Sequence, residues 1–247
     1  APAVRGSRPA GEARAERRRV SLRSVLVRPL RPLQAALRLR LAEWAVRKSV
    51  APRRGRAHGL PGELVMSLTS YPPRFPVLAR TLRSLLAQDV RPDRLVLWLA
   101  EKDLHLLPQD VRQLESFGVE IRSCPDWGPH KKIIPALLEW SDAFIVTADD
   151  DLYYPPNWLR TVVAASDGTS IICRRAHLPK RTSTGFAPYA SWTHDFVTAG
   201  EPRGDLFPTG GAGALYPPRS LPPETYDTGA FMALCPRADD IWLFVMG

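Results

Sequence analysis

Three consecutive aspartates, Asp149, Asp150 and Asp151, follow an apolar run at residues 143–148. A short apolar run rich in β-branched residues predicts a buried strand, and the three carboxylates then lie where that strand leaves the sheet. Ligands bind at the carboxyl ends of strands in open α/β sheets, so this position favours a binding site. A divalent cation such as Mg²⁺ or Mn²⁺ prefers carboxylate oxygens and gives a reason to cluster like charges. The alternative interpretation is a solvated acidic turn.

Other polar residues lie at the ends of the neighbouring predicted elements. The turn after the first predicted strand ends in Arg74, which could reach a phosphate or a base. Glu101 follows the second predicted strand. Lys131 and Lys132 open a predicted helix, where a lysine and a helix N-terminus together favour an anion, although a solvated helix start is the simpler interpretation. Around a metal held by the aspartates, these residues would form a site for a diphosphate.

The elements that must position these residues alternate along the chain. Strands are predicted at residues 64–69, 94–99, 119–122, 143–148 and 170–173, and helices at 77–88, 108–117, 131–140 and 158–165. Strands that alternate with helices predict an α/β fold with a largely parallel sheet covered on both faces. A glycine-rich run at residues 210–214 would let the backbone come close to a ligand, or it is a plain flexible loop.

The chain from residue 64 to residue 242 resembles the family 2-like glycosyltransferases of the GT-A fold. Four elements carry the resemblance, namely S-L-T-S-Y-P-P-R at 67–74, G-P-H-K-K at 128–132, D-D-D followed by Y-Y-P-P-N-W at 149–158, and A-D-D-I-W at 238–242. The resemblance implies a Rossmann-like three-layer sandwich with a mostly parallel central sheet. It also implies a hexosyltransferase of polysaccharide biosynthesis that uses a nucleotide-sugar donor, with uridine diphosphate as the usual carrier.

The resemblance also implies roles for individual residues. It assigns the metal-binding D-x-D motif to Asp149 and Asp151, which would hold Mn²⁺ or Mg²⁺, with Asp150 near the ribose or the sugar. The implied donor-binding residues are Thr69, Tyr71, Arg74, Glu101, Lys132 (with Lys131 as its substitute), Asp149 and Asp150. Family members carry an acid pair near the acceptor, which corresponds here to Asp239 and Asp240. We expect Asp240 to be the catalytic base and Asp239 to cap a helix or contact the acceptor.

These roles predict an inverting transfer from a nucleoside diphosphate sugar to a hydroxyl of a glycan or lipid-linked acceptor. Two alternatives stay open. One is a metal-dependent nucleotidyltransferase or phosphohydrolase, although the turn after the first strand lacks the glycines of a phosphate loop. The other is a non-catalytic scaffold that binds a membrane or nucleic acid.

Charge divides the chain into two parts. The 247 residues carry a formal net charge of +9, but residues 1–62 hold 16 Lys or Arg and 3 Asp or Glu, a balance of +13. The remaining residues hold 18 basic and 22 acidic side chains, a balance of −4. We therefore predict an Arg-rich tail with a linker at 1–62 and a GT-A domain at 63–247. The chain begins without Met and stops within an apolar run, so we expect a fragment with a truncated C-terminus.

Within the tail, residues 33–48 combine leucines at helical spacing with several arginines. This pattern predicts a basic amphipathic helix that binds an anionic membrane surface or, alternatively, packs on the domain. The tail has few aromatic residues for base stacking, which disfavours nucleic acid as a partner. Three scattered cysteines argue against a disulfide framework and a zinc site. We expect a cytoplasmic protein, peripheral on the inner face of the membrane.

Overall fold

The computed structural model describes residues 55–197 and 203–247, and all of them belong to one compact unit. The predicted amphipathic helix at 33–48 and most of the Arg-rich tail lie outside the described residues. The described chain opens with β1 (Arg56–Ala57), which pairs in parallel with β3 (Val90–Arg91). Residues 56–57 of the predicted linker therefore form part of the folded unit.

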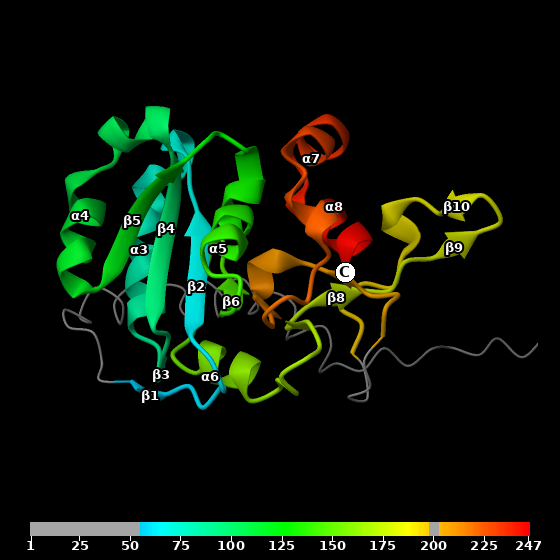
Figure 1. Cartoon of the computed structure of the whole chain (residues 1–247), viewed down its shortest axis with the longest axis horizontal. Coiled ribbons are helices and arrows are strands. Elements are labelled where there is room, and N and C mark those ends of the chain that lie inside the picture. Colours follow the sequence, from blue (N-terminus) through cyan, green and yellow to red (C-terminus); the bar gives the residue numbers. More distant parts are fainter. Residues whose placement is uncertain (1–54, 198–202) are drawn as a thin grey trace, which may run out of the picture. The chain divides into compact units, whose positions relative to one another are not determined.

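A six-stranded sheet has the order β5-β4-β2-β6-β12-β7 and forms the centre of this unit (Figure 1). Its strands are β2 (Leu64–Thr69), β4 (Arg94–Ala100), β5 (Val119–Cys124), β6 (Phe144–Thr147), β7 (Ile172–Cys173) and β12 (Ala214–Tyr216). The pairings of β2 with β4, β4 with β5 and β2 with β6 are parallel, whereas β12 is antiparallel to both of its neighbours. The predicted α/β fold with a mostly parallel central sheet is confirmed.

Helices cover both faces of the sheet. Successive side chains of a strand point to opposite faces, so a strand of consecutive apolar residues needs a covering layer on each side. The α-helices are α3 (Phe75–Leu86), α4 (Gln109–Arg112), α5 (Ile134–Glu139), α6 (Trp158–Val163), α7 (Thr228–Leu234) and α8 (Asp239–Met246). Leu64, Met66 and Leu68 of β2 pack in one hydrophobic cluster with α3, α4 and α6. Val65 packs in a second cluster with α5, α7 and α8. The unit that residues 55–197 and 203–247 form therefore has three layers.

Short 3₁₀ helices connect several of these elements. They are η1 (Pro72–Arg74), η2 (Glu101–Leu106), η3 (Gln113–Phe117), η4 (Gly128–Lys132), η5 (Tyr189–Ser191), η6 (Gly210–Ala212) and η7 (Pro223–Tyr226). The helix predicted at 131–140 is thus divided into η4 and α5. Pro135 lies in the first turn of α5, where its ring is tolerated. The backbone N–H that proline lacks would have no acceptor within the helix at this position.

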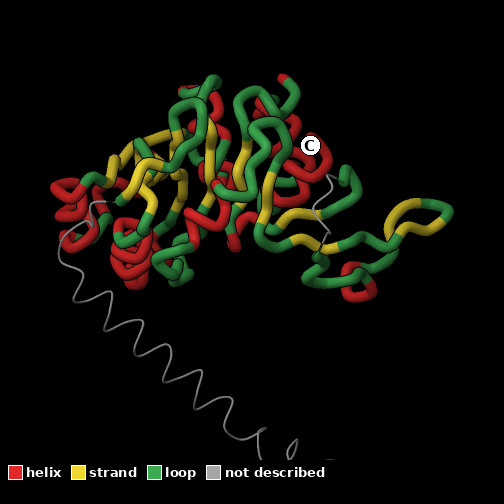
Figure 2. The backbone as a smooth tube through the Cα atoms, turned by 90° about the horizontal axis from the view of Figure 1, so that it is seen from below, coloured by secondary structure: helices red, strands yellow, loops and turns green. Residues whose placement is uncertain are grey.

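Beyond β7 the chain forms two small antiparallel pairs. β8 (Ala176–His177) pairs with β11 (Phe207–Pro208), and β9 (Arg181–Thr182) pairs with β10 (Gly185–Phe186). The β9–β10 hairpin projects from the rest of the described unit in both views (Figures 1 and 2). Within the described residues, no helix combines the length and the apolar character needed to cross a membrane.

Candidate functional site

The sheet topology brings four chain segments to one edge. β2 and β6 are parallel, so their carboxyl ends coincide there, and Asp149 follows β6. Because β12 is antiparallel to β6, its amino end, with the preceding glycines, lies at the same edge. β7 is antiparallel to β12 and therefore runs in the direction of β6, which brings the residues after Cys173 to this edge as well. The edge is where ligands bind in open α/β sheets.

Lys132, the last residue of η4, is the centre of the site. Its side chain is only 8% exposed, and its Nζ lies 3.0 Å from Asp149 Oδ1 and 2.8 Å from Asp239 Oδ2. Burial alone would lower the pKa of Lys132, but Asp239, Asp149 and Asp240 outweigh it and hold this pKa well above its usual value. The lysine is therefore charged, and it joins two acids that lie 90 residues apart in the sequence.

The acid pair at the start of α8 has two different environments. Asp239 is 7% exposed and forms the ion pair with Lys132. Asp240 is half-buried, and its Oδ1 accepts a hydrogen bond from the backbone N–H of Gly210 at 2.9 Å. Burial and the neighbouring Asp239 raise the pKa of Asp240. A carboxylate with a raised pKa is suited to accept a proton near neutral pH.

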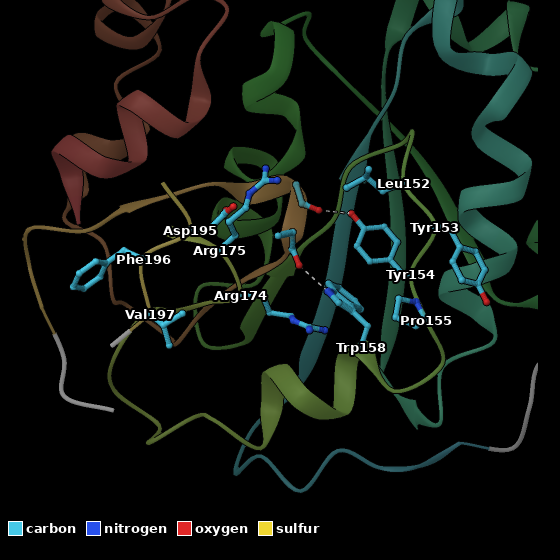
Figure 3. A pocket seen from close by; sticks show the side chains of 12 residues that line it. Leu152, Tyr153, Tyr154, Pro155, Trp158, Arg174, Arg175, Asp195, Phe196 and Val197 are labelled. Atoms are coloured by element: carbon cyan, nitrogen blue, oxygen red, sulfur yellow. Dashed lines mark hydrogen bonds between the residues drawn. The ribbon is translucent and has the colours of Figure 1, made fainter. Parts of the chain in front are cut away.

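The glycine-rich run lies directly against Asp149. A Cβ atom at Gly211 would lie 2.1 Å from Asp149 Oδ2, so any larger residue there would displace the Asp149 carboxylate. Tyr154 connects the two segments, because its hydroxyl accepts from the Asp149 N–H at 2.7 Å. The same hydroxyl donates to the Gly211 carbonyl at 2.8 Å (Figure 3). Nearby, Trp158 Nε1 donates to the Ala212 carbonyl at 2.8 Å. The run is therefore packed against other residues of the site, and its close approach to a ligand stays a prediction.

The other two aspartates point to different partners. Asp151 forms an ion pair with Arg74, and the Asp151 side chain is 33% exposed. Hydrogen bonding with Tyr71 and the charge of Asp151 raise the pKa of Arg74. The carboxylate of Asp150 is buried and accepts from Ser70 Oγ at 2.6 Å, and burial raises its pKa. Asp150 therefore anchors the turn after β6, whereas Asp149 and Asp151 remain accessible.

The remaining sequence-predicted residues lie at the same edge but outside this network. The Thr69 hydroxyl donates to the Trp98 carbonyl at 2.8 Å. Glu101 is exposed at the start of η2, and within the described residues it forms no hydrogen bond or ion pair with the aspartates. Lys131 Nζ lies 2.8 Å from Asp126, away from the acid cluster. Of the two lysines, only Lys132 contacts the predicted metal and base residues.

Asp149 and Asp151 are the residues that could hold a metal. Among residues 55–197 and 203–247, no three His, Cys, Asp or Glu side chains are grouped to bind one. Mg²⁺ is commonly bound through one or two carboxylates, with waters and substrate phosphates as the other ligands. Both carboxylates are paired with cations, Asp149 with Lys132 and Asp151 with Arg74, so a metal ion here would replace part of this compensating charge. Carboxylate oxygens are ligands that Mg²⁺ and Mn²⁺ prefer, and the assignment of these two residues as metal ligands stays a prediction.

Sequence reasoning missed several residues of the site. Tyr154 lies within the quoted Y-Y-P-P-N-W motif, and Ser70 within the S-L-T-S-Y-P-P-R motif, but neither was assigned a role. Arg174 and Arg175 follow β7 at the same edge and line a cavity next to Gly211. Their position directly after a predicted strand is a local signal of the kind that identified Asp149, but the sequence does not show at which edge of the sheet that strand ends.

Comparison with known proteins adds little to this geometry. No family model matches the chain, and no curated protein matches it. Among solved structures, the chain is similar to the mannosyltransferase PcManGT from Pyrobaculum calidifontis in complex with GDP-Man and Mn²⁺, with a TM-score of 0.38 and 14% sequence identity. The match covers 54% of this chain and 41% of that chain, so it extends over less than half of the solved protein. A likeness of this degree carries no argument about substrate or reaction.

Proposed function

We propose that this protein is a metal-dependent inverting glycosyltransferase. It transfers a hexosyl group from a nucleoside diphosphate sugar, with UDP as the favoured carrier, to a hydroxyl of a glycan or lipid-linked acceptor. The observation that carries the proposal is the buried Lys132, which is held between Asp149 and Asp239 with Asp240 beside it. This arrangement combines a cation for a diphosphate, two accessible carboxylates for a metal and a separate carboxylate for a proton.

The donor would lie across the ends of β2 and β6. Thr69, Tyr71, Arg74 and Glu101, from the turns after β2 and β4, are assigned to the nucleoside end. Lys132 contributes a positive charge beside the diphosphate. Asp149 and Asp151 would hold Mn²⁺ or Mg²⁺, which supplies Lewis-acid stabilisation of a departing diphosphate when bound. We assign Asp150 a positioning role, because its carboxylate binds Ser70.

In the transfer step the bond between the anomeric carbon and the diphosphate oxygen breaks, and its electron pair leaves with the diphosphate. The acceptor oxygen attacks the anomeric carbon from the opposite face, which inverts the configuration. Asp240 removes the hydroxyl proton of the acceptor, a role that its raised pKa supports. Asp239 stays paired with Lys132 and holds it in place. Because Lys132 is already held in position by its ion pairs, it requires little reorganisation during the reaction.

Thermal unfolding of the full chain with UDP, GDP and UDP-sugars, with and without Mn²⁺, tests the donor site. A ligand at 100 times its dissociation constant stabilises the folded state by about 2.7 kcal/mol, which is roughly 5–10 °C for a protein of this size. Asp151→Asn should remove the Mn²⁺-dependent part of this shift. Asp142→Asn is the matched control, because it removes an exposed carboxylate that pairs with Arg219 outside the site.

Product analysis then separates the proposal from its alternatives. A glycosyltransferase releases a nucleoside diphosphate, whereas a nucleotidyltransferase releases pyrophosphate and a phosphohydrolase releases inorganic phosphate or a nucleoside monophosphate. If no nucleotide stabilises the protein with either metal, the donor site is wrong and the scaffold interpretation gains support. An Asp151→Asn variant that keeps the full Mn²⁺-dependent shift would refute the assignment of the metal ligands.

A further inference from the structure

A cavity of about 450 Å³ opens beside residues 152–155, which directly follow the three aspartates in the sequence (Figure 3). This volume falls within the range of about 300–1,000 Å³ that is typical of small-molecule sites. Its lining includes Tyr154, Trp158, Arg174, Arg175, Asp195 and Phe196. The sequence motifs assigned to the donor do not include the two arginines or the segment at 195–196. No part of the donor is therefore assigned to this cavity.

The cavity shares a wall with the acid cluster. Gly211 lines the cavity on one side and lies so close to the Asp149 carboxylate that an added Cβ would be 2.1 Å from Asp149 Oδ2. Tyr154, another lining residue, is bonded to both Gly211 and Asp149. The next residue before Gly211, Gly210, donates its N–H to Asp240. A molecule that contacts Gly211 in the cavity is therefore next to Asp149, the proposed metal ligand. It is also one residue along the chain from Gly210, which binds the proposed base Asp240.

Among the charged residues that line the cavity, two arginines, Arg174 and Arg175, outnumber one carboxylate, Asp195, so the balance of charge is positive. Arg174 is anchored by its backbone N–H, which donates to the Gly213 carbonyl at 3.0 Å. Arg175 Nε donates to Thr209 Oγ1 at 2.7 Å. Several other arginines form ion pairs with carboxylates, namely Arg74, Arg94, Arg122, Arg160, Arg203 and Arg219. Within the described residues, Arg174 and Arg175 form none, so both guanidinium groups are available to a ligand.

The sheet order separates this cavity from the nucleoside end. Thr69 and Arg74 follow β2, on one side of β6, whereas Arg174 follows β7, which lies beyond β12 on the other side. The donor we propose occupies the β2 side and the metal ligands at the end of β6. The β7 side is then free for the second substrate.

We propose that the cavity is the acceptor subsite and that it selects acceptors carrying an anionic group, a phosphate or a carboxylate. This inference rests on the proposed function. The planar guanidinium groups of Arg174 and Arg175 suit bidentate binding of such an anion. The carboxylates of Asp149 and Asp240 repel the same anion from the opposite end. The cavity thus orients the acceptor, with its charge on the arginines and its hydroxyl toward Asp240.

Calorimetric titration of the full chain with glucose 6-phosphate, glucuronate and glucose tests this selection. At least one anionic sugar should bind more tightly than glucose, and the comparison of the two identifies phosphate or carboxylate as the preferred anion. Arg174→Gln should weaken that binding by about tenfold or more, the usual effect of losing a hydrogen bond to a charged group. Arg174→Lys keeps the positive charge but loses the paired N–H donors of the guanidinium group. It should therefore recover part of the binding affinity that Arg174→Gln loses. Arg181→Gln, at an exposed arginine above the Phe186 ring, is the matched control and should bind like the wild type.

Two results would overturn the inference. One is equal binding of glucose and both anionic sugars by the wild type. The other is equal weakening by Arg174→Gln and Arg181→Gln, which would show nonspecific attraction to a basic surface. A parallel titration with UDP and Mn²⁺ keeps this test separate from the proposed function. If UDP binds and the anionic sugars do not, the acceptor inference alone fails; if Arg174-dependent sugar binding occurs without any nucleotide binding, the glycosyltransferase proposal fails and the anion site stands.

Discussion

Asp239 and Asp240 are neighbours in sequence, but their carboxylates have different partners. Consecutive residues of an α-helix project about 100° apart around its axis, so the two acids cannot occupy the same position. Asp239 is turned into the protein toward Lys132, whereas Asp240 faces the glycine-rich run. The N-cap of α8 is Ala238, so the structure gives Asp239 an ion-pairing role in place of the capping role considered from the sequence.

This difference predicts unequal effects of two isosteric substitutions. Asp240→Asn should reduce sugar transfer by roughly 10²–10⁴-fold, because the acceptor hydroxyl loses its general base. Asp239→Asn should lower stability more than Asp240→Asn, because it leaves the buried Lys132 with one fewer counter-charge. Transfer rates and urea unfolding of both variants measure the two effects. If Asp239→Asn is the slower enzyme at matched stability, the roles are reversed, and if both variants turn over normally, the base lies elsewhere.

At the level of residues, the sequence predicts which side chains stand at strand ends but not which of them meet. Asp149 and Lys132 were found because a strand and a helix visibly end or begin there. Tyr154 and Ser70 make contacts that depend on the approach of distant segments, such as the 80 residues between Ser70 and Asp150. Local patterns contain no information on that approach.

The glycine-rich run shows how one element controls the site. Gly213→Ala should destabilise the protein by about 1–3 kcal/mol, because Gly213 has a φ of +105° and its new Cβ would lie 2.5 Å from the buried Trp158 ring. Gly204→Ala is the matched control, since a Cβ there meets nothing within 4 Å, and its effect should stay within about 0.5 kcal/mol. Urea unfolding measures both. Equal stability of the two variants would contradict the close approach of Gly213 to Trp158.

His130 connects η4 to α7 and makes that contact sensitive to pH. Its ring stacks on Phe231 at 4.4 Å, and its Nε2 lies 2.8 Å from the Cys235 carbonyl, which can only accept, so Nε2 carries the proton. Burial lowers the pKa of His130, and its Nδ1 is buried without a hydrogen-bond partner. The unfolded chain therefore takes up a proton first, at a pKa of about 6.5. The stability that the neutral His130 ring contributes is fully present above about pH 6.5, the pKa of histidine in the unfolded chain. It is lost as the pH falls from there toward the lower pKa of His130 in the folded protein.

The free energy of unfolding measured at pH 7.5 and pH 5.5 checks this prediction. The wild type should lose more stability over this interval than His130→Phe, which cannot titrate and starts from a lower stability at pH 7.5. His105→Gln, at an exposed histidine of η2, should keep the pH dependence of the wild type. If the wild type and His130→Phe lose the same stability, His130 is not the responsible group.

The predicted strands and the predicted helices at 77–88 and 158–165 are confirmed, because short apolar runs and helical periods are visible in their own residues. The helices predicted at 108–117 and 131–140 are each divided between a 3₁₀ helix and a short α-helix. β12 was not predicted, although it lies between β6 and β7. It has only three residues and pairs with strands that are more than 40 residues away in sequence. Its burial comes from tertiary contacts and not from a local pattern. Without β12, the sequence could not show that β7 ends at the same edge as β6, and the two arginines of the cavity were missed.

At the scale of the whole molecule, charge is distributed unevenly along the chain, and the folded unit does not account for this distribution. The predicted domain at 63–247 has a balance of −4, and the predicted tail at 1–62 has a balance of +13. Residues 55–62 belong to the folded unit, where His58 Nε2 lies 3.0 Å from Asp93 and Leu60 packs against the core. A truncation that tests the tail should therefore begin the chain at Gly55 and not at residue 61, so that β1 and its contacts are retained.

We predict that the full chain sediments with vesicles of anionic lipid at low salt and that the chain starting at Gly55 does not. Each Lys or Arg near an anionic surface contributes about 1 kcal/mol, so a segment with this many arginines binds strongly, whereas an acidic domain is repelled. Binding should weaken steeply as salt is raised. Vesicles of neutral lipid are the control, and equal thermal stability of the two chains shows that the truncation spares the fold. If the full chain ignores anionic vesicles at low salt, the tail does not bind membranes, and a peripheral location loses its physical basis.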